Sequence, residues 1–283
     1  MKKLMITTAA LAAALAVNAD VVSSSVVGYS AKEQLNTKPT GILTFQWDAC
    51  NGNTVKLNGF VVPSVTNVYS YDETGSQMIP NWHLNAPKIQ VRTSDGSYAV
   101  LYYCADAYNN ETGETLAGWA TEYGDYDTTT TLALGGGAWV SCASANCTFT
   151  TSGAVASEET AVGGYSTPTL LCGGAFPVSF KLNDTDAVTW TLTPGQSYDG
   201  DTMIENWHLN APKIQVRTDD GSYAVLYYCS DAYNNDTGDT VAGWATEFGD
   251  LDTTTTVSVG GGFWLSQPNG DKKIYVTVKN PIK

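Results

Sequence analysis

The stretch from Lys88 to Cys104, KIQVRTSDGSYAVLYYC, decides the fold class of this chain. Polar and apolar side chains alternate from Lys88 to Thr93, as they do in a strand with one solvated face and one buried face. The dipeptide Asp95-Gly96 then favours a tight turn, because glycine tolerates positive φ, and the segment from Tyr98 to Cys104 returns as the partner strand. The stretch therefore predicts a β-hairpin.

The hairpin occurs twice, because the chain repeats itself at an offset of 125 residues. Residues 78–141 and 203–266 differ at 13 of 64 aligned positions, which leaves 51 identities. The match extends outward to Lys56–Asn58, which corresponds to Lys181–Asn183. After a recent duplication most residues are still shared whether or not they have a function, so identity between the two copies does not by itself mark a functional site.

Short segments rich in Thr, Tyr, Val and Leu predict further strands, since β-branched and aromatic side chains pack well on pleated surfaces. No helical period of comparable length is present in the sequence. The glycine runs Gly135–Gly137 and Gly260–Gly262 are typical of turns between strands. The further strands predicted in the first copy are Leu43–Trp47, Thr54–Val62, Val65–Tyr71, Thr128–Leu134, Ala138–Cys142 and Thr148–Thr151.

These elements predict an all-β protein made of two tandem antiparallel β-sandwich or barrel-like repeats. We expect a signal peptide at residues 1–19, a first repeat at residues 20–155 and a second repeat at residues 156–283. Near the C-terminus, Ile274–Val278 alternates apolar and polar residues, and we expect it to close its own sheet. The alternative is strand addition to another copy of the chain.

The N-terminal segment has the features of a removable secretory signal peptide. Lys2 and Lys3 precede an uncharged run from Leu4 to Val17, and Val17-Asn18-Ala19 supplies the small residues of a cleavage site. The run has 14 residues, fewer than the roughly 20 that a membrane-spanning helix needs. We therefore expect a secreted, cell-surface or periplasmic protein with no membrane span in the mature chain.

The chain is strongly acidic, with 28 Asp and Glu against 14 Lys and Arg and a formal net charge of −14. Loss of Lys2 and Lys3 with the signal peptide leaves 14 minus 2, or 12, basic groups, so the mature charge is about −16. Nucleic acids are excluded as partners, because their binding depends on Lys and Arg that neutralise phosphates. Divalent cations and neutral polymers remain compatible with this charge.

Six cysteines in an exported chain favour disulfides over catalytic thiols or a zinc site. Each repeat has one early cysteine and one cysteine on the hairpin, and two more cysteines lie five residues apart near the junction. The alternative is that the cysteines are buried free thiols. The predicted disulfides are Cys50–Cys104, Cys172–Cys229 and Cys142–Cys147.

The sequence motifs of several enzyme classes are absent. The chain lacks His-Glu-x-x-His, Gly-x-Ser-x-Gly, the phosphate-binding Gly-x-x-x-x-Gly-Lys and a dinucleotide fingerprint. His83 and His208 are too few for a zinc site of three or four ligands, so we interpret them as structural or surface residues. We predict no catalytic residues. The alternative is a secreted glycoside hydrolase-like enzyme with an acidic cleft, whose nominal carboxylate pairs are Glu122 with Asp125 and Glu247 with Asp250.

Two loops dense in oxygen ligands make calcium a candidate cofactor, since hard cations prefer oxygen. The loops span Asp106–Glu114 and Asp231–Asp239, and their spacing does not match an EF-hand. We favour the alternative of a plain polar turn, because Asn, Asp, Thr and Gly are also ordinary turn residues. The candidate calcium ligands are Asp106, Asn109, Glu111, Asp231, Asn234 and Asp236.

Aromatic side chains provide the remaining functional signal. Carbohydrate recognition often stacks sugar rings on Trp and Tyr, while Asn and Asp bind the hydroxyls. The alternative, which we favour, is that these rings fill the cores of the sheets. The candidate ligand-binding residues are Trp82, Tyr108, Trp119, Trp207, Tyr233 and Trp244.

The chain resembles uncharacterised exported bacterial β-repeat proteins whose mature chains open with a Val-Val-Gly-Tyr segment. The likeness rests on Ser25–Tyr29, on the strand Ile214–Arg217, on Gly243-Trp244 and on Gly261–Leu265. It covers most of each repeat, but that group has no assigned reaction, cofactor or catalytic residue. The resemblance therefore implies export and β repeats only.

We expect a non-enzymatic secreted or cell-surface protein with an adhesive or envelope-structural role, because two linked copies suit multivalent contact. Its expected partners are glycans or envelope proteins. The two alternatives are a tandem carbohydrate-binding module and a secreted glycoside hydrolase-like enzyme.

Overall fold

The structure, a computed structural model, describes residues 27–38, 40–48, 54–93, 96–156, 158–163, 169–218, 222–268 and 274–281. These residues form several antiparallel sheets and two short 3₁₀ turns, so the expected all-β class is confirmed. Within these ranges, no helix has the length and apolar character needed to cross a membrane. The predicted signal peptide at residues 1–19 lies outside the described residues.

The predicted hairpin forms in both repeats. β5 pairs antiparallel with β6, and Ile89 lies opposite Leu101. In the second repeat β17 pairs with β18 in the same register, and Ile214 lies opposite Leu226. All four side chains are buried, so the alternation in the sequence corresponds to a core face and an outer face. The bounds are Lys88–Arg92 for β5, Tyr98–Asn109 for β6, Lys213–Arg217 for β17 and Tyr223–Tyr233 for β18.

Each hairpin belongs to a five-stranded sheet, and the two sheets have the same strand order. The order is β2-β9-β5-β6-β7 in the first repeat and β12-β21-β17-β18-β19 in the second. The remaining strands of these sheets are β2 (Gly41–Thr44), β7 (Glu114–Ala120), β9 (Gly137–Ser141), β12 (Thr169–Cys172), β19 (Thr240–Ala245) and β21 (Phe263–Ser266).

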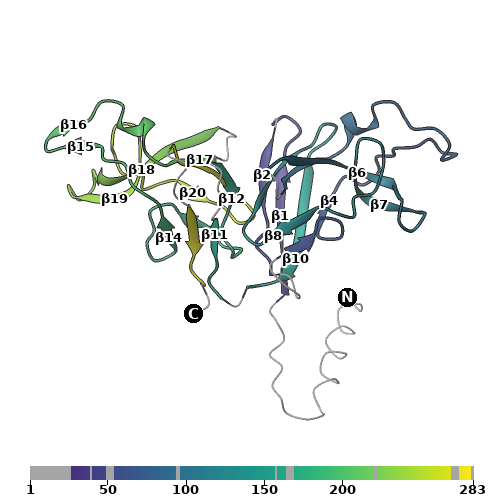
Figure 1. The fold of residues 1–283 in the computed structure, drawn as a ribbon, viewed down its shortest axis with the longest axis horizontal. Helices are drawn as coiled ribbons and strands as arrows, with labels where there is room; N and C mark the ends of the chain where they lie inside the picture. Colours follow the sequence, from purple (N-terminus) through teal and green to yellow (C-terminus); the bar gives the residue numbers. More distant parts are fainter. Residues whose placement is uncertain are drawn as a thin grey trace, which may run out of the picture.

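A three-stranded sheet packs against the inner face of each five-stranded sheet, β1-β10-β4 in the first repeat and β11-β22-β14 in the second. In Figure 1, β10 is drawn below β2 and β6, and β14 is drawn below β17. The strands are β1 (Val27–Gln34), β4 (Val61–Pro63), β10 (Cys147–Ala154), β11 (Ala161–Gly163), β14 (Val188–Thr191) and β22 (Tyr275–Val278).

Smaller elements complete each repeat. The strand pair β3-β8 of the first repeat corresponds to β13-β20 of the second, and a 3₁₀ turn, η1 or η2, precedes each central hairpin. The bounds are Thr54–Lys56 (β3), Thr131–Ala133 (β8), Phe180–Lys181 (β13), Thr256–Val257 (β20), Trp82–Asn85 (η1) and Trp207–Leu209 (η2).

One tryptophan lies at the centre of each core. Trp119 is fully buried and contacts Tyr103 and Phe149, with ring centroids 5.4 Å and 6.3 Å away. Trp244 is also fully buried and contacts the ring of Trp190 at 5.1 Å. Because Phe149 and Trp190 come from the three-stranded sheets, these rings join the two layers of each repeat.

An asparagine fastens each buried tryptophan to the loop that follows it. The Asn58 side-chain amide donates to the carbonyls of Trp119 at 3.0 Å and Asp127 at 2.7 Å, and its Oδ1 accepts from the Trp119 amide at 2.7 Å. Asn183 makes the same three bonds in the second repeat. Gly118 permits this approach, since a Cβ there would lie 2.7 Å from Asn58 Oδ1. The shared Lys-Leu-Asn segments thus have a structural role in both repeats.

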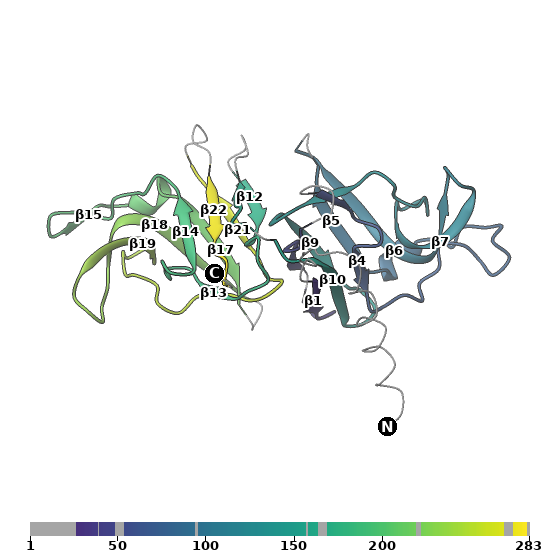
Figure 2. The same cartoon turned by 90° about the horizontal axis from the view of Figure 1, so that it is seen from below.

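The repeats meet at their glycine turns and edge strands, side by side (Figure 2). The Thr44 hydroxyl, at the end of β2, donates to the Gly261 carbonyl at 2.9 Å. Trp139 and Trp264, which occupy matching positions in the two repeats, contact each other with ring centroids 5.5 Å apart. Contact between a residue and its own counterpart is the signature of a two-fold arrangement. The two repeats therefore pack with approximate two-fold symmetry.

Several predicted strands differ from the observed ones. Val65–Tyr71 is not a strand of a sheet, because its last amides donate to a carboxylate instead of a neighbouring strand. Thr54–Val62 is divided into β3 and β4 by a turn in which Gly59 has a φ of 84°. β1 and β7 are strands that we did not predict. β22 lies between β11 and β14, so the C-terminal segment closes its own sheet as expected.

The predicted disulfides are absent among the described cysteines. Cys104, Cys142, Cys147, Cys172 and Cys229 are buried free thiols, and Cys50 lies outside the described residues, so the pair Cys50–Cys104 has only one described member.

The pairing of Cys172 with Cys229 is wrong because the two cysteines were matched to the wrong positions. Cys172 lies opposite Phe263 in its sheet, as Leu43 lies opposite Ala138. Cys172 is therefore the counterpart of Leu43 and not of Cys50. It packs in the main core of the second repeat, whereas Cys229 packs in a separate cluster with Trp207.

Cys142 and Cys147 lie side by side as thiols, not as the predicted disulfide. Their side chains share a hydrogen bond, and the Ser64 hydroxyl also donates to the Cys147 sulfur at 3.9 Å. The Cys142 hydrogen bond is the main cause that lowers the pKa of Cys147 to about 6. The same bond and burial raise the pKa of Cys142.

Asn58→Ala is expected to lower the free energy of unfolding by roughly 2–4 kcal/mol, because it removes three hydrogen bonds from a partly buried site. Chemical denaturation measures the change. Asn110→Ala, at an exposed asparagine on the same repeat, is the control and is expected to cost less than about 0.5 kcal/mol. Equal losses in the two variants would contradict the role of Asn58.

A thiolate titration tests the cysteine pair. Among the described cysteines only Cys147 has a lowered pKa, since burial raises the pKa of Cys104 and Cys229 to about 11. Ultraviolet absorbance is expected to report one thiolate that forms at a lower pH than an ordinary thiol. Cys142→Ala should move this step to higher pH, and Cys104→Ala should leave it in place. A step that persists in Cys147→Ala would show that the assignment is wrong.

Candidate functional site

A carboxylate on the central strand fixes the outer loop of the first repeat. Asp106 follows Cys104 on β6, where the register with β7 shifts between Cys104 and Ala107. Such a bulge redirects a side chain out of the regular ladder. The Asp106 carboxylate accepts from the Ser70 amide at 2.7 Å, the Ser70 hydroxyl at 2.9 Å and the Tyr71 amide at 2.9 Å. We call this arrangement the loop anchor.

The second repeat has the same loop anchor. Asp231 accepts from the Ser197 amide at 2.8 Å, the Ser197 hydroxyl at 2.9 Å and the Tyr198 amide at 2.8 Å. Burial alone would raise the pKa of the Asp231 carboxyl, but the hydrogen bonds from Ser197 and Tyr198 outweigh it and hold the pKa below its usual value. The loop anchors show that Ser70 and Tyr71 correspond to Ser197 and Tyr198.

The loop that follows the anchor in the first repeat is built around a second carboxylate. Asp72 Oδ1 accepts from the Thr74 hydroxyl at 2.8 Å and from the Ser76 amide at 3.0 Å. Gly75 has a φ of 67° and its amide donates to the Asp72 carbonyl. The Thr74 hydroxyl is the largest cause that lowers the pKa of Asp72, so this carboxylate is charged at neutral pH. The loop is therefore held in one shape by its own side chains.

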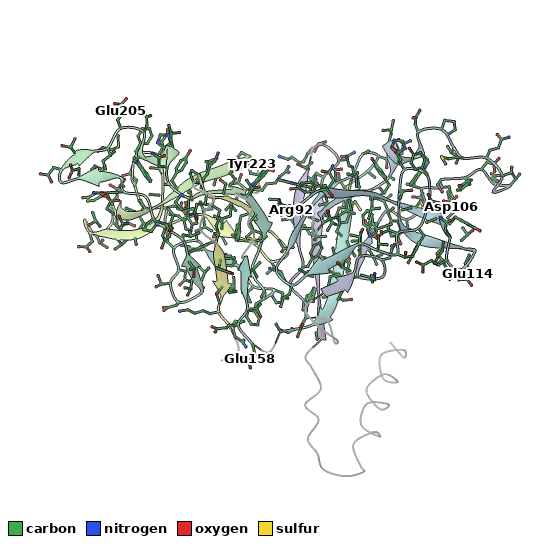
Figure 3. The ribbon with its side chains drawn as sticks, in the orientation of Figure 1. Arg92, Asp106, Glu114, Glu158, Glu205 and Tyr223 are labelled. Atoms are coloured by element: carbon green, nitrogen blue, oxygen red, sulfur yellow. The ribbon has the colours of Figure 1, made fainter. Side chains whose placement is uncertain are left out.

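This loop and the end of β6 enclose a hollow with a volume of about 610 Å³. Its walls carry three tyrosines and three carboxylates, and Tyr69 and Tyr108 are 55% and 42% exposed. Figure 3 shows Asp106 and Glu114 towards the outer end of the first repeat. The volume lies within the usual range of small-molecule sites. We name it the tyrosine hollow, and its lining residues are Tyr69, Tyr71, Asp72, Glu73, Thr74, Gly75, Asp106, Tyr108 and Thr115.

The two repeats differ in the length of this loop. Five residues separate Asp72 from Met78 in the first repeat, whereas three separate Asp199 from Met203 in the second. The shorter segment forms a tight hairpin from β15 (Tyr198–Asp199) and β16 (Thr202–Met203). Gln196 replaces Tyr69, and its amide donates to the Tyr198 carbonyl at 2.7 Å. The second repeat thus lacks both the longer loop and the third tyrosine.

The structure corrects most of the predicted aromatic ligand residues. Trp82, Trp119, Trp207 and Trp244 are at most 4% exposed, so they cannot present a ring to a ligand. The indoles of Trp82, Trp119 and Trp207 also donate to backbone carbonyls, which fixes them in the interior.

Two predicted ligand residues remain accessible. Tyr108 lies in the tyrosine hollow, and Tyr233, its counterpart, is 39% exposed.

The candidate calcium ligands mainly stabilise turns. Asn109 Oδ1 accepts from the Glu111 amide at 2.9 Å, and Asn234 Oδ1 accepts from the Asp236 amide at 2.9 Å. The expected loops are in fact the ends of the β6–β7 and β18–β19 hairpins. Glu111 accepts from the Thr128 hydroxyl, and Asp106 and Asp231 form the loop anchors. Among the described residues, no group of three His, Cys, Asp or Glu side chains is close enough to hold a metal ion.

The sequence prediction missed Tyr69, Tyr71 and Glu73. A signal was present, because the alignment of the two repeats breaks between Tyr69 and Met78. Residues that differ between two recent copies carry more information about a specialised site than residues that are shared.

Comparisons with protein-family models, with curated proteins and with solved structures gave no match for this chain.

The loop anchor predicts a pH-dependent opening in the second repeat. The native pKa of Asp231 is below the unfolded value of 3.8. Its stabilising contribution is therefore present above pH 3.8 and is lost as the pH falls through the native pKa. Hydrogen exchange of the Ser197 and Tyr198 amides, corrected for intrinsic rates, should accelerate over this range.

Asp231→Asn provides the control for this experiment. These two amides should already exchange faster at neutral pH in the variant, because an amide oxygen accepts more weakly than a carboxylate. If the Ser197 and Tyr198 amides exchange as slowly in Asp231→Asn as in the native chain, and no faster at low pH, then contacts other than Asp231 hold the loop.

Proposed function

We propose that this chain is a non-catalytic, exported carbohydrate-binding protein whose binding site is the tyrosine hollow of the first repeat. The observation that carries the proposal is the combination of partly exposed tyrosines and carboxylates around one preformed hollow. Such sites bind by burying apolar surface against rings and by fixing polar groups with a few well-placed oxygens.

The lining residues match the two chemical surfaces of a sugar. The C–H face of a pyranose packs on aromatic rings, and Tyr69 and Tyr108 offer such rings at the wall of the hollow. The hydroxyls of a sugar donate to carboxylates. Glu73 supplies such an acceptor, and Asp72 can accept through Oδ2, since the Thr74 hydroxyl and the Ser76 amide donate to its Oδ1. Negative charge on Asp72 favours neutral or cationic sugars over sugar acids.

The carboxylates of the hollow favour binding over hydrolysis. Glycoside hydrolysis uses two carboxyl groups that both face the scissile bond. Asp106 is committed to the Ser70 and Tyr71 amides, and Asp72 to the turn of its own loop. This leaves Glu73 as the carboxylate of the hollow that has no structural task in the loop. The glycoside hydrolase-like alternative therefore receives less support than binding.

In an adhesive or envelope-structural role, the protein would attach to glycans through the tyrosine hollow. Because the hollow lies at the outer end of one repeat, a bound glycan would leave the second repeat free for other contacts. The expected export, which rests on the N-terminal sequence, would bring the site to extracellular or envelope polymers.

The test is a binding titration with cello-, xylo- and chito-oligosaccharides. We expect at least one of them to bind the full chain, and Tyr69→Ala to weaken that binding about tenfold, since loss of one ring contact costs on the order of 1.4 kcal/mol. Gln196→Ala at the matching position of the second repeat is the control and should bind like the native chain. Failure of every probe, or equal affinity of Tyr69→Ala and the native chain, would refute the proposal.

A further inference from the structure

A second cavity lies between the two repeats, away from the tyrosine hollow. It has a volume of about 270 Å³, and its walls come from the first repeat on one side and from β12 of the second on the other. Most of the lining side chains are apolar and buried, with Phe45, Leu132 and Leu171 at most 8% exposed. We name it the junction cavity; its lining residues are Phe45, Val91, Arg92, Thr93, Thr131, Leu132, Ala133, Gly136, Gly137, Leu170 and Leu171.

One cation lines this apolar cavity. Arg92 ends strand β5, and Figure 3 shows it in the central region where the repeats meet. Its guanidinium donates to the Thr169 carbonyl at 2.8 Å, which holds the side chain across the junction. A guanidinium has five N–H donors in a rigid fork, so donors remain for a ligand. Among the described residues no carboxylate forms an ion pair with Arg92.

The symmetry-related place in the second repeat is closed. It is lined by Arg217, Val257, Ser258, Gly261 and Gly262, the counterparts of first-repeat cavity residues, yet its volume is only about 20 Å³. Lys32 from β1 lines this smaller space, together with Ile42. Arginine is thus present on both sides of the junction, but only the Arg92 side offers room for a ligand.

We infer that the junction cavity binds a small apolar carboxylate, with the carboxylate on Arg92 and the apolar part between Phe45, Leu132 and Leu171. The positive charge of Arg92 favours an anionic ligand, because a carboxylate in an apolar cavity must be paired with a donor. The planar guanidinium can donate two parallel hydrogen bonds to a carboxylate. Volume limits its size: about 270 Å³ is the space of about nine water molecules. A straight-chain or aromatic acid with about ten non-hydrogen atoms fits this space.

The test compares acids with neutral analogues of the same shape. Octanoate and benzoate are titrated into the full chain by calorimetry, beside octanol and benzyl alcohol. The acids are expected to bind at least tenfold more tightly than the alcohols. Arg92→Gln should weaken acid binding at least tenfold, while Arg217→Gln, at the closed counterpart, should change it less than twofold.

A second pair of variants keeps the test valid if Arg92→Gln loosens the junction. Ala133→Leu adds volume at the exposed rim of the cavity and should block acids and alcohols alike, while Ser258→Leu is its counterpart on the closed side and should block neither. Circular dichroism and thermal unfolding confirm that each variant is folded.

Three outcomes would overturn the inference: no binding of either acid at millimolar concentration, equal binding of acids and alcohols, or acid binding that survives both Arg92→Gln and Ala133→Leu. None of these outcomes bears on oligosaccharide binding, because the junction cavity and the tyrosine hollow share no lining residue.

Discussion

The bond between a carboxylate on the central strand and two successive backbone amides is the constraint on which the outer end of each repeat depends. Asp106 and Asp231 project from a bulge, and each accepts from two successive backbone amides at the start of the outer loop. Without this bond these amides would be buried without a partner, which costs more than an ordinary hydrogen bond gains. The loop anchor therefore sets where each outer loop begins. The longer loop of the first repeat then forms the wall of the tyrosine hollow, and the shorter loop of the second repeat forms the β15–β16 hairpin.

Duplication gave the protein two scaffolds of the same strand order, and small changes at their edges gave them different cavities. Two extra residues and one tyrosine produce a hollow of about 610 Å³ in the first repeat. At the junction, related residues enclose about 270 Å³ on one side and about 20 Å³ on the other. The contact between the rings of Trp139 and Trp264 joins the two repeats, whereas the residues that line the cavities differ between them. For each cavity, the matching positions of the other repeat can therefore be substituted as a control.

The sequence predicted the parts of the fold that are governed by local pattern. Alternation from Lys88 to Thr93 and the Asp95-Gly96 dipeptide were sufficient to predict the central hairpin, in which Ile89 lies opposite Leu101. The pattern could not separate a buried ring from an exposed one, because Trp119 and Tyr108 lie in equally mixed surroundings in the sequence and only tertiary packing distinguishes them.

Long-range geometry explains the other failures. Cys172 was matched to Cys50 by its order along the chain, whereas strand register places it at the position of Leu43. Polar residues near Asp106 left calcium binding open beside the favoured plain turn, and in the structure Asp106 and Asn109 accept from backbone amides. The tyrosine hollow could be predicted only in part, because Tyr69 and Tyr108 are far apart in the sequence and meet through the loop anchor.

The central claim is that one repeat, and not both, carries the carbohydrate site. The stoichiometry of oligosaccharide binding to the full native chain, measured by isothermal titration calorimetry, tests this claim most directly. We expect one oligosaccharide to bind per chain. Two equivalent sites per chain would contradict it, because the second repeat would then bind without the longer loop and the third tyrosine.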